Sequence, residues 1–204
     1  MDRMMNTYGK VHNSKYWSEI DSIVPREGTK QILDIGCGPG LLLKESIDRY
    51  NVSNAVGIDL SPVMLSKANE VLEPYKSQVE VNLVEQHMQE DTSLPVAMDL
   101  IFCSRVMRSF ENVIDVLQEV KKSLSVNGYF ILLDWDRLGI NSYLKYFEND
   151  DYLKTMTFED KIRLQRNFSK YSLEDWFILF NHVGLSIGHS FQLDPAHIVV
   201  IAKK

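Results

Sequence analysis

The sequence predicts an α/β fold built on a largely parallel sheet. Short runs of β-branched and aliphatic residues alternate with segments whose apolar residues recur at the helical period, which is the pattern of this class. The length of 204 residues corresponds to about one to one and a half average domains, so we expect a single domain over residues 1–204. The predicted strands lie at residues 30–35, 54–59, 79–84, 98–104, 129–135, 185–193 and 197–202.

The first two helices are predicted from the residues that end the first two strands. Glycines at positions 36, 38 and 40 close the first strand, and a helix is expected from residue 41 to about residue 50. After the second strand, Ser61 can cap a helix N-terminus and Pro62 suits the first helical turn. This helix is predicted to reach about residue 72.

The later helices are predicted from an apolar stripe and from capping residues. Residues 109–124 place five aliphatic side chains on one helical face, and Asn127–Gly128 is then expected to turn the chain into the fifth strand. Ser172 and Asp175 match a capping box, and Gly184 is expected to end the helix that they begin. The last two strands are expected to close the sheet as a pair.

Composition and charge exclude several classes of protein. With 45% hydrophobic and 25% charged residues the chain matches an ordinary globular domain, and its longest apolar run, residues 129–133, is far shorter than the roughly 20 residues that span a bilayer. A net charge of −6 removes the basic footprint of a nucleic-acid binder. Residues 1–6 lead into no signal-peptide stretch, and the two cysteines are interpreted as reduced thiols. We expect a cytoplasmic protein without a membrane partner, and nucleic acid is not the expected partner.

The strongest chemical signal is the segment 32–40, ILDIGCGPG. A strand that runs into alternate glycines lets the backbone approach a ligand, because no Cβ stands in the way, and the following helix N-terminus offers N–H groups to an anion. Nineteen residues after Gly40 the second strand ends in Asp59, whose carboxylate can accept hydrogen bonds from both hydroxyls of a ribose. These features predict a site for an adenosine-containing ligand. The alternative is a glycine turn with a surface aspartate.

The spacing of the glycines distinguishes between adenosine cofactors. A dinucleotide fingerprint needs its third glycine where this chain has Leu41, whereas the pattern here is G-x-G-x-G with Asp34 two residues before the first glycine. This pattern resembles the class I S-adenosylmethionine-dependent methyltransferases. Residues 57–61 (GIDLS), 94–101 (LPVAMDLI) and 117–128 are similar to later segments of that family, and residues 172–204 are similar more loosely.

The resemblance implies a fold, a cofactor and a set of site residues. The fold is a three-layer Rossmann-like methyltransferase fold, with helices on both faces of a mostly parallel seven-stranded sheet in the order 3-2-1-4-5-7-6. The cofactor is S-adenosylmethionine. Its methionine part would lie against the glycine loop, its ribose on the acid that ends strand two, and its adenine among side chains after strands two and three. With the contacts that follow strand four, the implied residues are Asp34, Gly36, Cys37, Gly38, Gly40, Asp59, Leu60, Met64, Gln86, His87, Met88, Ser104 and Arg105.

Two positions bear on adenine recognition and on the acceptor. The pair Gln86–His87 stands where the family usually has an acid and a small residue, although the amide oxygen of Gln86 can still accept from the adenine amino group. After the fourth strand, residues 104–106 lack the Asn/Asp-Pro-Pro-aromatic signature of enzymes that methylate amino nitrogens of bases or glutamine. Nothing resembles the metal-binding acids of the catechol enzymes.

Catalysis of methyl transfer can rest largely on positioning. The sulfonium has a good neutral leaving group, so a base is needed only if the acceptor must lose a proton first. The candidate bases are His12, Asp134 and Asp136, with the alternatives that His12 belongs to a helix on the domain edge and that either aspartate is a cap or loop acid. We expect no metal. The remaining histidines interpreted as surface or core residues are His182, His189 and His197.

An acceptor pocket is expected between an N-terminal helical cap, residues 1–25, and a helical lid insertion at about 136–171. The family commonly inserts substrate-recognising structure there, and the insertion is about twofold enriched in aromatic residues. Thr157 and Asp160 predict a helix within it. The alternative is that its aromatic side chains only pack on the sheet edge or form a dimer contact. The pocket candidates are Tyr8, Tyr16, Trp135, Tyr143 and Tyr146, and the other aromatic residues of the insertion are Phe147, Tyr152, Phe158, Phe168 and Tyr171.

The leading hypothesis is an S-adenosylmethionine-dependent methyltransferase that acts on a small molecule. The alternatives are a catalytically silent cofactor-binding protein that regulates or scaffolds a partner, and a protein or nucleic-acid methyltransferase. The sequence leaves the acceptor, its charge and the oligomeric state open, because acids at 134 and 136 favour a cation whereas arginines at 105, 163 and 166 favour an anion. Cys37 and Cys103 are expected at the ends of neighbouring strands, as two buried residues or, alternatively, as a redox pair.

Overall fold

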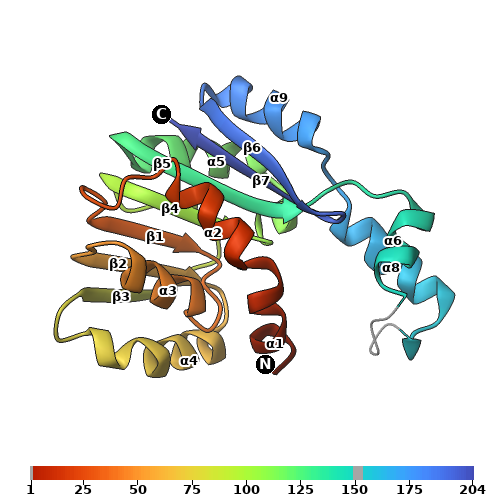
Figure 1. The fold of residues 1–204 in the computed structure, drawn as a ribbon, viewed down its shortest axis with the longest axis horizontal. Helices are drawn as coiled ribbons and strands as arrows, with labels where there is room; N and C mark the ends of the chain where they lie inside the picture. The colour runs from red at the N-terminus through yellow and green to blue at the C-terminus, as the bar shows by residue number, and fades with distance from the viewer. Residues whose placement is uncertain (1, 149–153) are drawn as a thin grey trace.

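A computed structural model describes residues 2–148 and 154–204, with side chains described from residue 7 onwards. Its described residues form a seven-stranded sheet in the order β3-β2-β1-β4-β5-β7-β6 (Figure 1). This is the predicted strand order. The strands are β1 (Gln31–Ile35), β2 (Asn54–Asp59), β3 (Glu80–Glu85), β4 (Met98–Ser104), β5 (Leu124–Trp135), β6 (Ser186–Asp194) and β7 (His197–Lys203).

The direction of the strands also agrees with the predicted fold class. The strands β3, β2, β1, β4 and β5 are parallel neighbours, whereas β7 runs antiparallel to both β5 and β6. The first residue of β7 therefore lies at the edge of the sheet where the parallel strands end, opposite Trp135 in the β5–β7 register. This is the edge at which open α/β sheets bind ligands.

Helices cover both faces of the sheet because the strands are buried on both sides. In β1, Leu33 and Ile35 belong to one core with residues of α5 and α9, whereas Ile32 belongs to the other core with residues of α2 and α3. Continuous apolar strands of this kind are typical of parallel sheets. The helices are α1 (Asp2–Val11), α2 (Ser14–Asp21), α3 (Leu41–Arg49), α4 (Pro62–Leu72), α5 (Val113–Ser123), α6 (Ile140–Tyr146), α8 (Phe158–Phe168) and α9 (Leu173–Val183), with single 3₁₀ turns η1 (Glu73–Tyr75) and η2 (Met107–Ser109).

The predicted helix caps are confirmed. The hydroxyl of Ser61 accepts from the backbone N–H of Met64 at the start of α4, with Pro62 as the first helical residue. Ser172 and Asp175 make the reciprocal capping box of α9, and the next residue after that helix, Gly184, has φ +73°. The hydroxyl of Thr157 accepts from the backbone N–H of Asp160 at the start of α8 and donates to the Asp160 carboxylate, which confirms the helix predicted inside the insertion.

The region between β4 and β5 differs from the prediction. Instead of one helix over 109–124, the chain forms the 3₁₀ turn η2 and then α5, which begins at Val113. The strand β5 begins at Leu124, and Asn127–Gly128 lies inside it as part of an irregularity in pairing with β4. A Cβ at position 128 would lie 2.7 Å from the carbonyl oxygen of Met98, so the glycine allows a close backbone approach rather than a hairpin turn.

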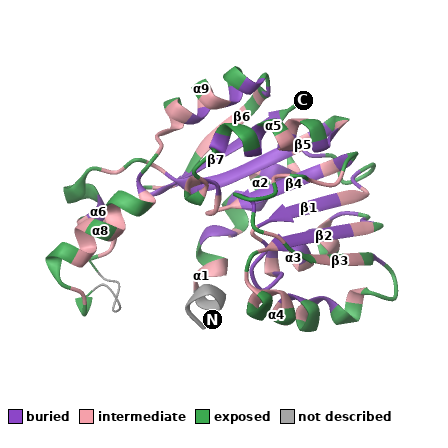
Figure 2. Cartoon of the chain, turned by 180° about the vertical axis from the view of Figure 1, so that it is seen from behind, coloured by how far each residue is buried: buried purple, intermediate pink, exposed green. Residues whose placement is uncertain are grey.

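The N-terminal segment and the insertion are packed very differently. In α2, Tyr16, Trp17 and Ile20 are buried in the core, whereas α8 has no buried residue. Figure 2 shows the same contrast, with buried central strands and with α6 and α8 projecting from the sheet as largely half-buried and exposed elements. Residue Tyr152 of the predicted insertion lies outside the described residues.

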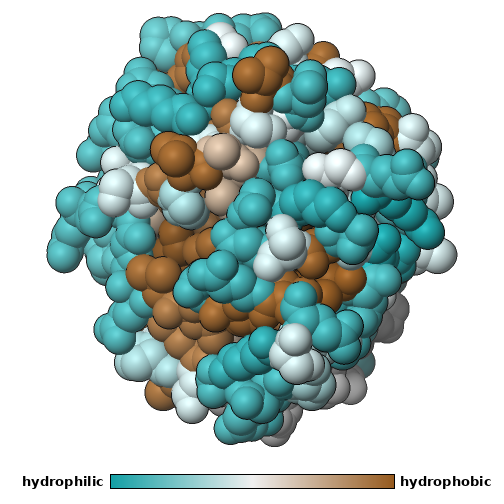
Figure 3. All heavy atoms as spheres, turned by 90° about the vertical axis from the view of Figure 1, so that its left-hand side faces the viewer, coloured by the Kyte–Doolittle hydropathy of each residue, from teal (hydrophilic) through white to brown (hydrophobic). Residues whose placement is uncertain are grey.

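The side of the molecule at the amino ends of the parallel strands has a mixed surface. Apolar side chains cross the middle of this face, with hydrophilic side chains around them (Figure 3). None of the helices that the structure describes is both long and apolar enough to cross a membrane.

Candidate functional site

The glycine loop after β1 has a backbone that only glycine adopts without strain. Gly36, Gly38 and Gly40 have φ values of +75°, +51° and +78°. A Cβ on Gly36 would lie 2.5 Å from a methyl group of Val106, and one on Gly40 would lie 3.0 Å from Cβ of Ala68 on α4. The absence of a Cβ on Gly36 therefore leaves the floor of the site, which is the cavity surface formed by this loop, open to a ligand. The absence of a Cβ on Gly40 lets α3 pack against α4.

Asp59 links the end of β2 to this loop. One of its carboxylate oxygens accepts from the backbone N–H of Gly38 at 2.8 Å, and the other accepts from the N–H of Ser61 at 2.9 Å. The carboxylate is thus fixed beside the glycine loop. This is the position from which the sequence predicts that it binds a ribose.

Asp34 is an acid in an unusual environment. It is only 2% exposed, and its Oδ1 has no hydrogen-bond partner among the described residues. Burial, together with the nearby charge of Asp59, raises the pKa of the Asp34 carboxyl to about 8. A buried carboxyl that lines a cavity and has an unsatisfied oxygen is a natural partner for an ammonium group, because the cation would restore the carboxylate and satisfy it.

Two cavities meet at the glycine loop. The larger cavity, of about 610 Å³, includes Asp34, Gly36 and Gly38 in its lining, and the smaller cavity, of about 290 Å³, includes Asp59. Both are lined by Gly36 and Val106, so the two cavities adjoin at this point. Three more of the predicted cofactor residues line the larger cavity, namely Cys37, Ser104 and Arg105. Four more line the smaller cavity, namely Leu60, Gln86, His87 and Met88.

Two predicted cofactor residues line neither cavity. Gly40 lies behind the loop against α4, and its role is the close helix packing described above. Met64 lies in the first turn of α4 and is likewise absent from both linings, although its neighbour in the prediction, Leu60, is 66% exposed beside Asp59. Phe110, which the sequence did not single out, adds an apolar side chain to the smaller cavity instead.

Gln86 is held by its amide nitrogen. Its Nε2 donates to the backbone carbonyls of Asp91 and Ser93, both at 2.8 Å, and so ties down the loop after β3. The amide oxygen is left as the polar atom that can face a ligand in the smaller cavity, consistent with the predicted role of accepting from an amino group. Met88, beside it, is 6% exposed and supplies apolar lining.

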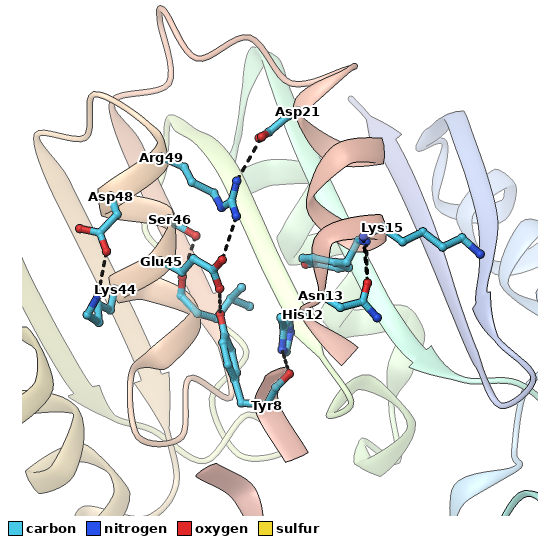
Figure 4. Close-up of polar contacts among 12 residues, drawn as sticks. Tyr8, His12, Asn13, Lys15, Asp21, Lys44, Glu45, Ser46, Asp48 and Arg49 are labelled. Atoms are coloured by element: carbon cyan, nitrogen blue, oxygen red, sulfur yellow. Dashed lines mark hydrogen bonds and ion pairs between the residues drawn. The ribbon is translucent and has the colours of Figure 1, made fainter. Parts of the chain in front are cut away.

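His12 is the predicted base that reaches the larger cavity. Its Nδ1 lies 3.3 Å from the carbonyl oxygen of Tyr8, so that nitrogen carries the hydrogen, and Nε2 accepts from the hydroxyl of Ser104 at 3.0 Å. Burial and the positive charge of Arg105 lower the pKa of His12 to about 3, so the imidazole is neutral at pH 7. Tyr8 stacks on this ring and donates its hydroxyl to Glu45 of α3, which fixes the N-terminal segment over the loop (Figure 4).

The other two predicted bases line neither cavity. Asp134 is fully buried and makes an ion pair with Arg108 at 2.7 Å, and it also accepts from the backbone N–H of Arg108. Its charge is therefore already satisfied. Asp136 accepts from the N–H of Arg137 and acts as a loop acid. The structure brings His12 alone of the three to the cavity wall.

Aromatic side chains from β5 and the insertion form the far wall of the larger cavity. Trp135 stacks on Phe168 of α8 with ring centroids 5.0 Å apart, and Tyr146 at the end of α6 and Phe147 after it pack against the same indole. Tyr8, Trp135, Tyr143 and Tyr146 line the cavity as predicted. The prediction for Tyr16 is wrong, because that side chain is 1% exposed in the core beside Trp17.

Sequence reasoning missed one residue of this wall, His197, and the carboxylate of Asp194 that contacts it. His197, interpreted from the sequence as a surface or core residue, lines the larger cavity, and its Nδ1 lies 2.9 Å from Asp194. Its Nε2 is buried without a partner among the described residues. The available signal was topological: a histidine that opens a strand antiparallel to strand five lies at the ligand-binding edge of the sheet.

The cysteines have no visible role in the chemistry of the site. Ile35 and Cys103 are partners in the β1–β4 register, so Cys37 and Cys103 do lie at the ends of neighbouring strands as predicted. Both thiols are free and buried, and burial raises their pKa well above the usual range, which makes them poor nucleophiles. Among the described residues there is no group of three or more His, Cys, Asp or Glu side chains that could hold a metal ion.

The fold and the site together define a class of protein. A Rossmann-like sheet, a glycine loop with an acid after strand two, and a cavity at the switch point describe an α/β protein that binds an adenosine cofactor. A sequence profile described as a methyltransferase domain matches residues 12–189. The chain belongs to this methyltransferase family, which confirms the resemblance seen in the sequence and, with it, the cofactor class, S-adenosylmethionine.

Curated relatives are similar over parts of the chain. A malonyl-[acyl-carrier protein] O-methyltransferase from Legionella pneumophila is 33% identical over 99 residues, which are 48% of this chain and 34% of that protein. A trans-aconitate 2-methyltransferase from Rhizobium etli is 29% identical over 121 residues, covering 59% of this chain and 44% of that protein. The chain thus spans less than half the length of either relative.

Solved structures share the fold over nearly the whole chain. An S-adenosylmethionine-dependent methyltransferase from Mesorhizobium loti has a TM-score of 0.69 at 17% identity, covering 95% of this chain and 100% of that one. A geranyl diphosphate C-methyltransferase from Streptomyces coelicolor, in complex with Mg²⁺, geranyl diphosphate and S-adenosyl-L-homocysteine, has a TM-score of 0.68 at 13% identity, covering 93% and 78%. These likenesses confirm the predicted three-layer methyltransferase fold.

Proposed function

We propose that this protein is an S-adenosylmethionine-dependent methyltransferase that acts on a small-molecule acceptor. The observation that carries the proposal is the pair of adjoining cavities at the glycine loop, one beside Asp59 and the other beside the unsatisfied carboxyl of Asp34. One ligand with a ribose and an ammonium group would use both. Named acceptors of the curated relatives, aconitate and a malonyl group on a carrier protein, support a small acceptor group.

The chain's own residues fit each part of the cofactor. Asp59 would accept from the ribose hydroxyls, and the oxygen of Gln86 would accept from the adenine amino group between Leu60 and Met88. Asp34 would lose its proton and receive the ammonium group of the methionine part, with the glycine loop beneath it. The bound cofactor would supply a methyl group activated by its positive sulfur.

The remaining groups would position the acceptor. The larger cavity extends from the glycine loop to the aromatic wall around Trp135, so its far end is available to a second molecule. Holding the acceptor atom at near-attack distance supplies most of the rate enhancement for such a transfer. If the acceptor carries a proton on the attacking atom, the neutral imidazole of His12, reached through the hydroxyl of Ser104, is the group placed to take it.

The two alternatives from the sequence predict different results. A silent cofactor-binding protein would bind S-adenosylmethionine and never consume it with any acceptor. A nucleic-acid methyltransferase would need a basic surface that the net charge of −6 argues against. The wall at the far end of the larger cavity, formed by α6 and α8, favours an acceptor of small size over a macromolecule.

Calorimetry with S-adenosylmethionine and S-adenosylhomocysteine tests the proposal, together with product detection by mass spectrometry after incubation of labelled cofactor with cell extract. We expect Asp59→Ala to weaken binding by about 1–3 kcal/mol, the scale of lost hydrogen bonds to a charged group. Asp59→Asn is the matched control, because its amide oxygen can still accept from the N–H of Gly38, and a smaller loss is expected. Absence of binding by the wild-type protein, or unchanged affinity in Asp59→Ala, would overturn the proposal.

A further inference from the structure

Polar side chains at the far end of the larger cavity have no part in holding the cofactor's adenosine. Arg105 follows β4, His197 opens β7, and Asp194 ends β6, so the topology brings them to one edge of the sheet from distant parts of the sequence. Both Arg105 and His197 line the larger cavity. Each presents a polar group whose hydrogen-bonding capacity the protein leaves unused.

The guanidinium of Arg105 has no hydrogen bond or ion pair within residues 7–148 and 154–204. Asp134, a carboxylate whose charge acts on Arg105, already makes an ion pair with Arg108. Burial and the positive charge of Arg108 lower the pKa of Arg105, whereas Asp134 and Tyr146 oppose that shift. The backbone of Arg105 is also held at φ +61°, a strained conformation for a residue with a side chain, by its N–H bond to Leu133.

His197 is oriented by its neighbours and left unsatisfied at one atom. Its Nδ1 lies 3.0 and 2.9 Å from the two carboxylate oxygens of Asp194, and that carboxylate also accepts from the hydroxyl of Tyr146 at 3.1 Å. The imidazole packs against the Trp135 indole with ring centroids 4.2 Å apart. The buried Nε2 has no partner in the part of the chain that the structure describes, which is a costly state unless a ligand supplies one.

We propose that these groups form a carboxylate-binding site for the methyl acceptor, with Arg105 donating to one carboxylate oxygen and the protonated Nε2 of His197 donating to the other. The proposal rests on the proposed function and names its substrate class. The guanidinium of Arg105 and the imidazolium of His197 each carry a charge of +1, and the carboxylate of Asp194 carries −1, so the net charge at the site is +1. That balance suits a monoanionic carboxylate better than a phosphate dianion.

The rest of the acceptor should be apolar. The walls beside the two polar groups are Trp135, Tyr143, Phe147 and Phe168. No carboxylate of the protein among the lining residues faces this end, since Asp34 lies at the glycine loop. An acceptor with one carboxylate and an apolar body would satisfy both kinds of surface.

Binding is expected to take up a proton, because a neutral His197 with its hydrogen on Nδ1 has no hydrogen on Nε2 to donate. The titratable and charged groups that face this imidazole are Asp194 from β6, Tyr146 from α6 and His12 after α1, and Arg105 after β4 lines the same cavity. Asp194 lies against Nδ1 and so fixes the orientation that turns Nε2 away from it. Asp194 is a positioning residue in this arrangement.

Calorimetry on the full chain, saturated with S-adenosylhomocysteine, tests the site. The probes are 3-phenylpropionate and hexanoate, each compared with its primary amide, and 2-phenylethylphosphonate as a dianion. Titrations in Tris and in HEPES at pH 7.5 measure proton uptake from the difference in buffer ionisation heat. We expect at least one carboxylate to bind about tenfold or more tighter than its amide, with uptake of a fraction of a proton.

Substitutions test which residues cause the preference for a carboxylate and the proton uptake. Arg105→Gln and His197→Gln should each lower carboxylate affinity by about tenfold or more and amide affinity much less, and only His197→Gln should abolish proton uptake. Asp194→Asn should reduce the proton uptake. If Asp194 had only a structural role, its substitution would leave the proton uptake unchanged. Lys10→Gln is the matched control, because Lys10 is an exposed cation that lines the same cavity.

Several outcomes would overturn the site. With the wild-type protein, these are equal binding of carboxylates and amides, or binding of the phosphonate that is tighter than that of the carboxylates. With the histidine variants, the contrary result is proton uptake that persists in His197→Gln but disappears in His12→Asn. With Arg105→Gln, it is a loss of S-adenosylhomocysteine affinity that exceeds the loss of carboxylate affinity. Should His197→Gln fail to fold, Arg105→Gln carries the test, because its side chain has no hydrogen bond to lose. A wild-type protein that binds no S-adenosylhomocysteine overturns the proposed function, whereas cofactor binding without carboxylate preference overturns this inference alone.

Discussion

The two ends of the site are built in different ways. The adenosine end uses residues from three short stretches of the chain, 34–38, 59–60 and 86–88, each at or directly after the end of a strand. The acceptor end takes single side chains from many elements, including His12, Arg105, Trp135, Tyr146 and His197. A cofactor shared by a whole family can be recognised by a local motif, whereas an acceptor particular to one protein is recognised by a surface that the fold assembles.

The covering segments differ in a corresponding way. The helix α2 contributes Tyr16, Trp17 and Ile20 to the core, so this part of the N-terminal cap is scaffold. The helices α6 and α8 contribute one buried side chain, Tyr143, and otherwise lie half-buried or exposed around the cavity. The proposed acceptor end is therefore lined by elements with few buried side chains, which is the kind of element expected to open locally.

The largest expected effect is at the junction of the two cavities. Gly36→Ala would place a Cβ in the left-handed region and 2.5 Å from Val106, so we expect a loss of about 2 kcal/mol or more in stability and at least about a hundredfold in S-adenosylhomocysteine affinity. Thermal unfolding and calorimetry measure both. Gly139→Ala is the control, since that glycine has φ −63° and no atom within 4 Å of an added Cβ. An alanine at 36 that binds normally would show that the loop does not form the floor of the site.

A smaller effect, dependent on pH, is expected at Asp34. The folded-state pKa of about 8 lies above the ordinary value of 3.8, so the folded apo protein holds a proton that the unfolded chain releases, and its stability falls as the pH rises from about 4 to 8. Asp34→Asn should remove this slope and raise the apo melting temperature at pH 8 by about 2–4 °C per kcal/mol gained. The same variant should weaken S-adenosylhomocysteine binding about tenfold or more, because the ammonium group loses its carboxylate. A variant with an unchanged pH slope would show that Asp34 is ionised in the apo protein.

A dynamic difference between the two covering segments is the next expectation. Hydrogen exchange should be slow in α2 with or without ligand, whereas α1, α6 and α8 should exchange faster and slow down when S-adenosylhomocysteine binds. Mass spectrometry of peptides from these helices gives the measurement. If α6 and α8 are fully protected in the free protein and do not change, the insertion is fixed scaffold and its predicted role as a lid is wrong.

The smallest effect concerns metal. Methyl transfer should be unaffected by a chelator, since the described residues bring together no set of His, Cys, Asp and Glu side chains with the geometry of a metal site. Activity measured before and after dialysis against EDTA checks this. Activity that disappears and returns with a divalent ion would show that the expectation of metal-independent transfer is wrong.

The fold and the adenosine end were predictable because they depend on neighbours in the sequence. Strand periodicity, the caps at Ser61 and Ser172, and the G-x-G-x-G loop all act over a few residues, and the structure has each of them in its predicted place. Predictions that needed longer contacts were less successful. The turn expected at Asn127–Gly128 lies inside β5 because pairing with β4 outweighs local turn preference, and Tyr16 is in the core because α2 packs on the sheet.

The sequence by itself determined the family, because the glycine motif and the later segments that define it are encoded by local spacing, and the resemblance to that family then implied the strand order and the residues expected around the adenosine. Only the tertiary structure decided that Asp134 is neutralised by Arg108, that Asp34 is left with an unsatisfied oxygen, and that His197 faces the cavity. The physical reason is that burial and pairing depend on atoms contributed by other strands. For His197 the decisive fact is the antiparallel course of β7, which carries the first residue of that strand to the edge where β4 and β5 end.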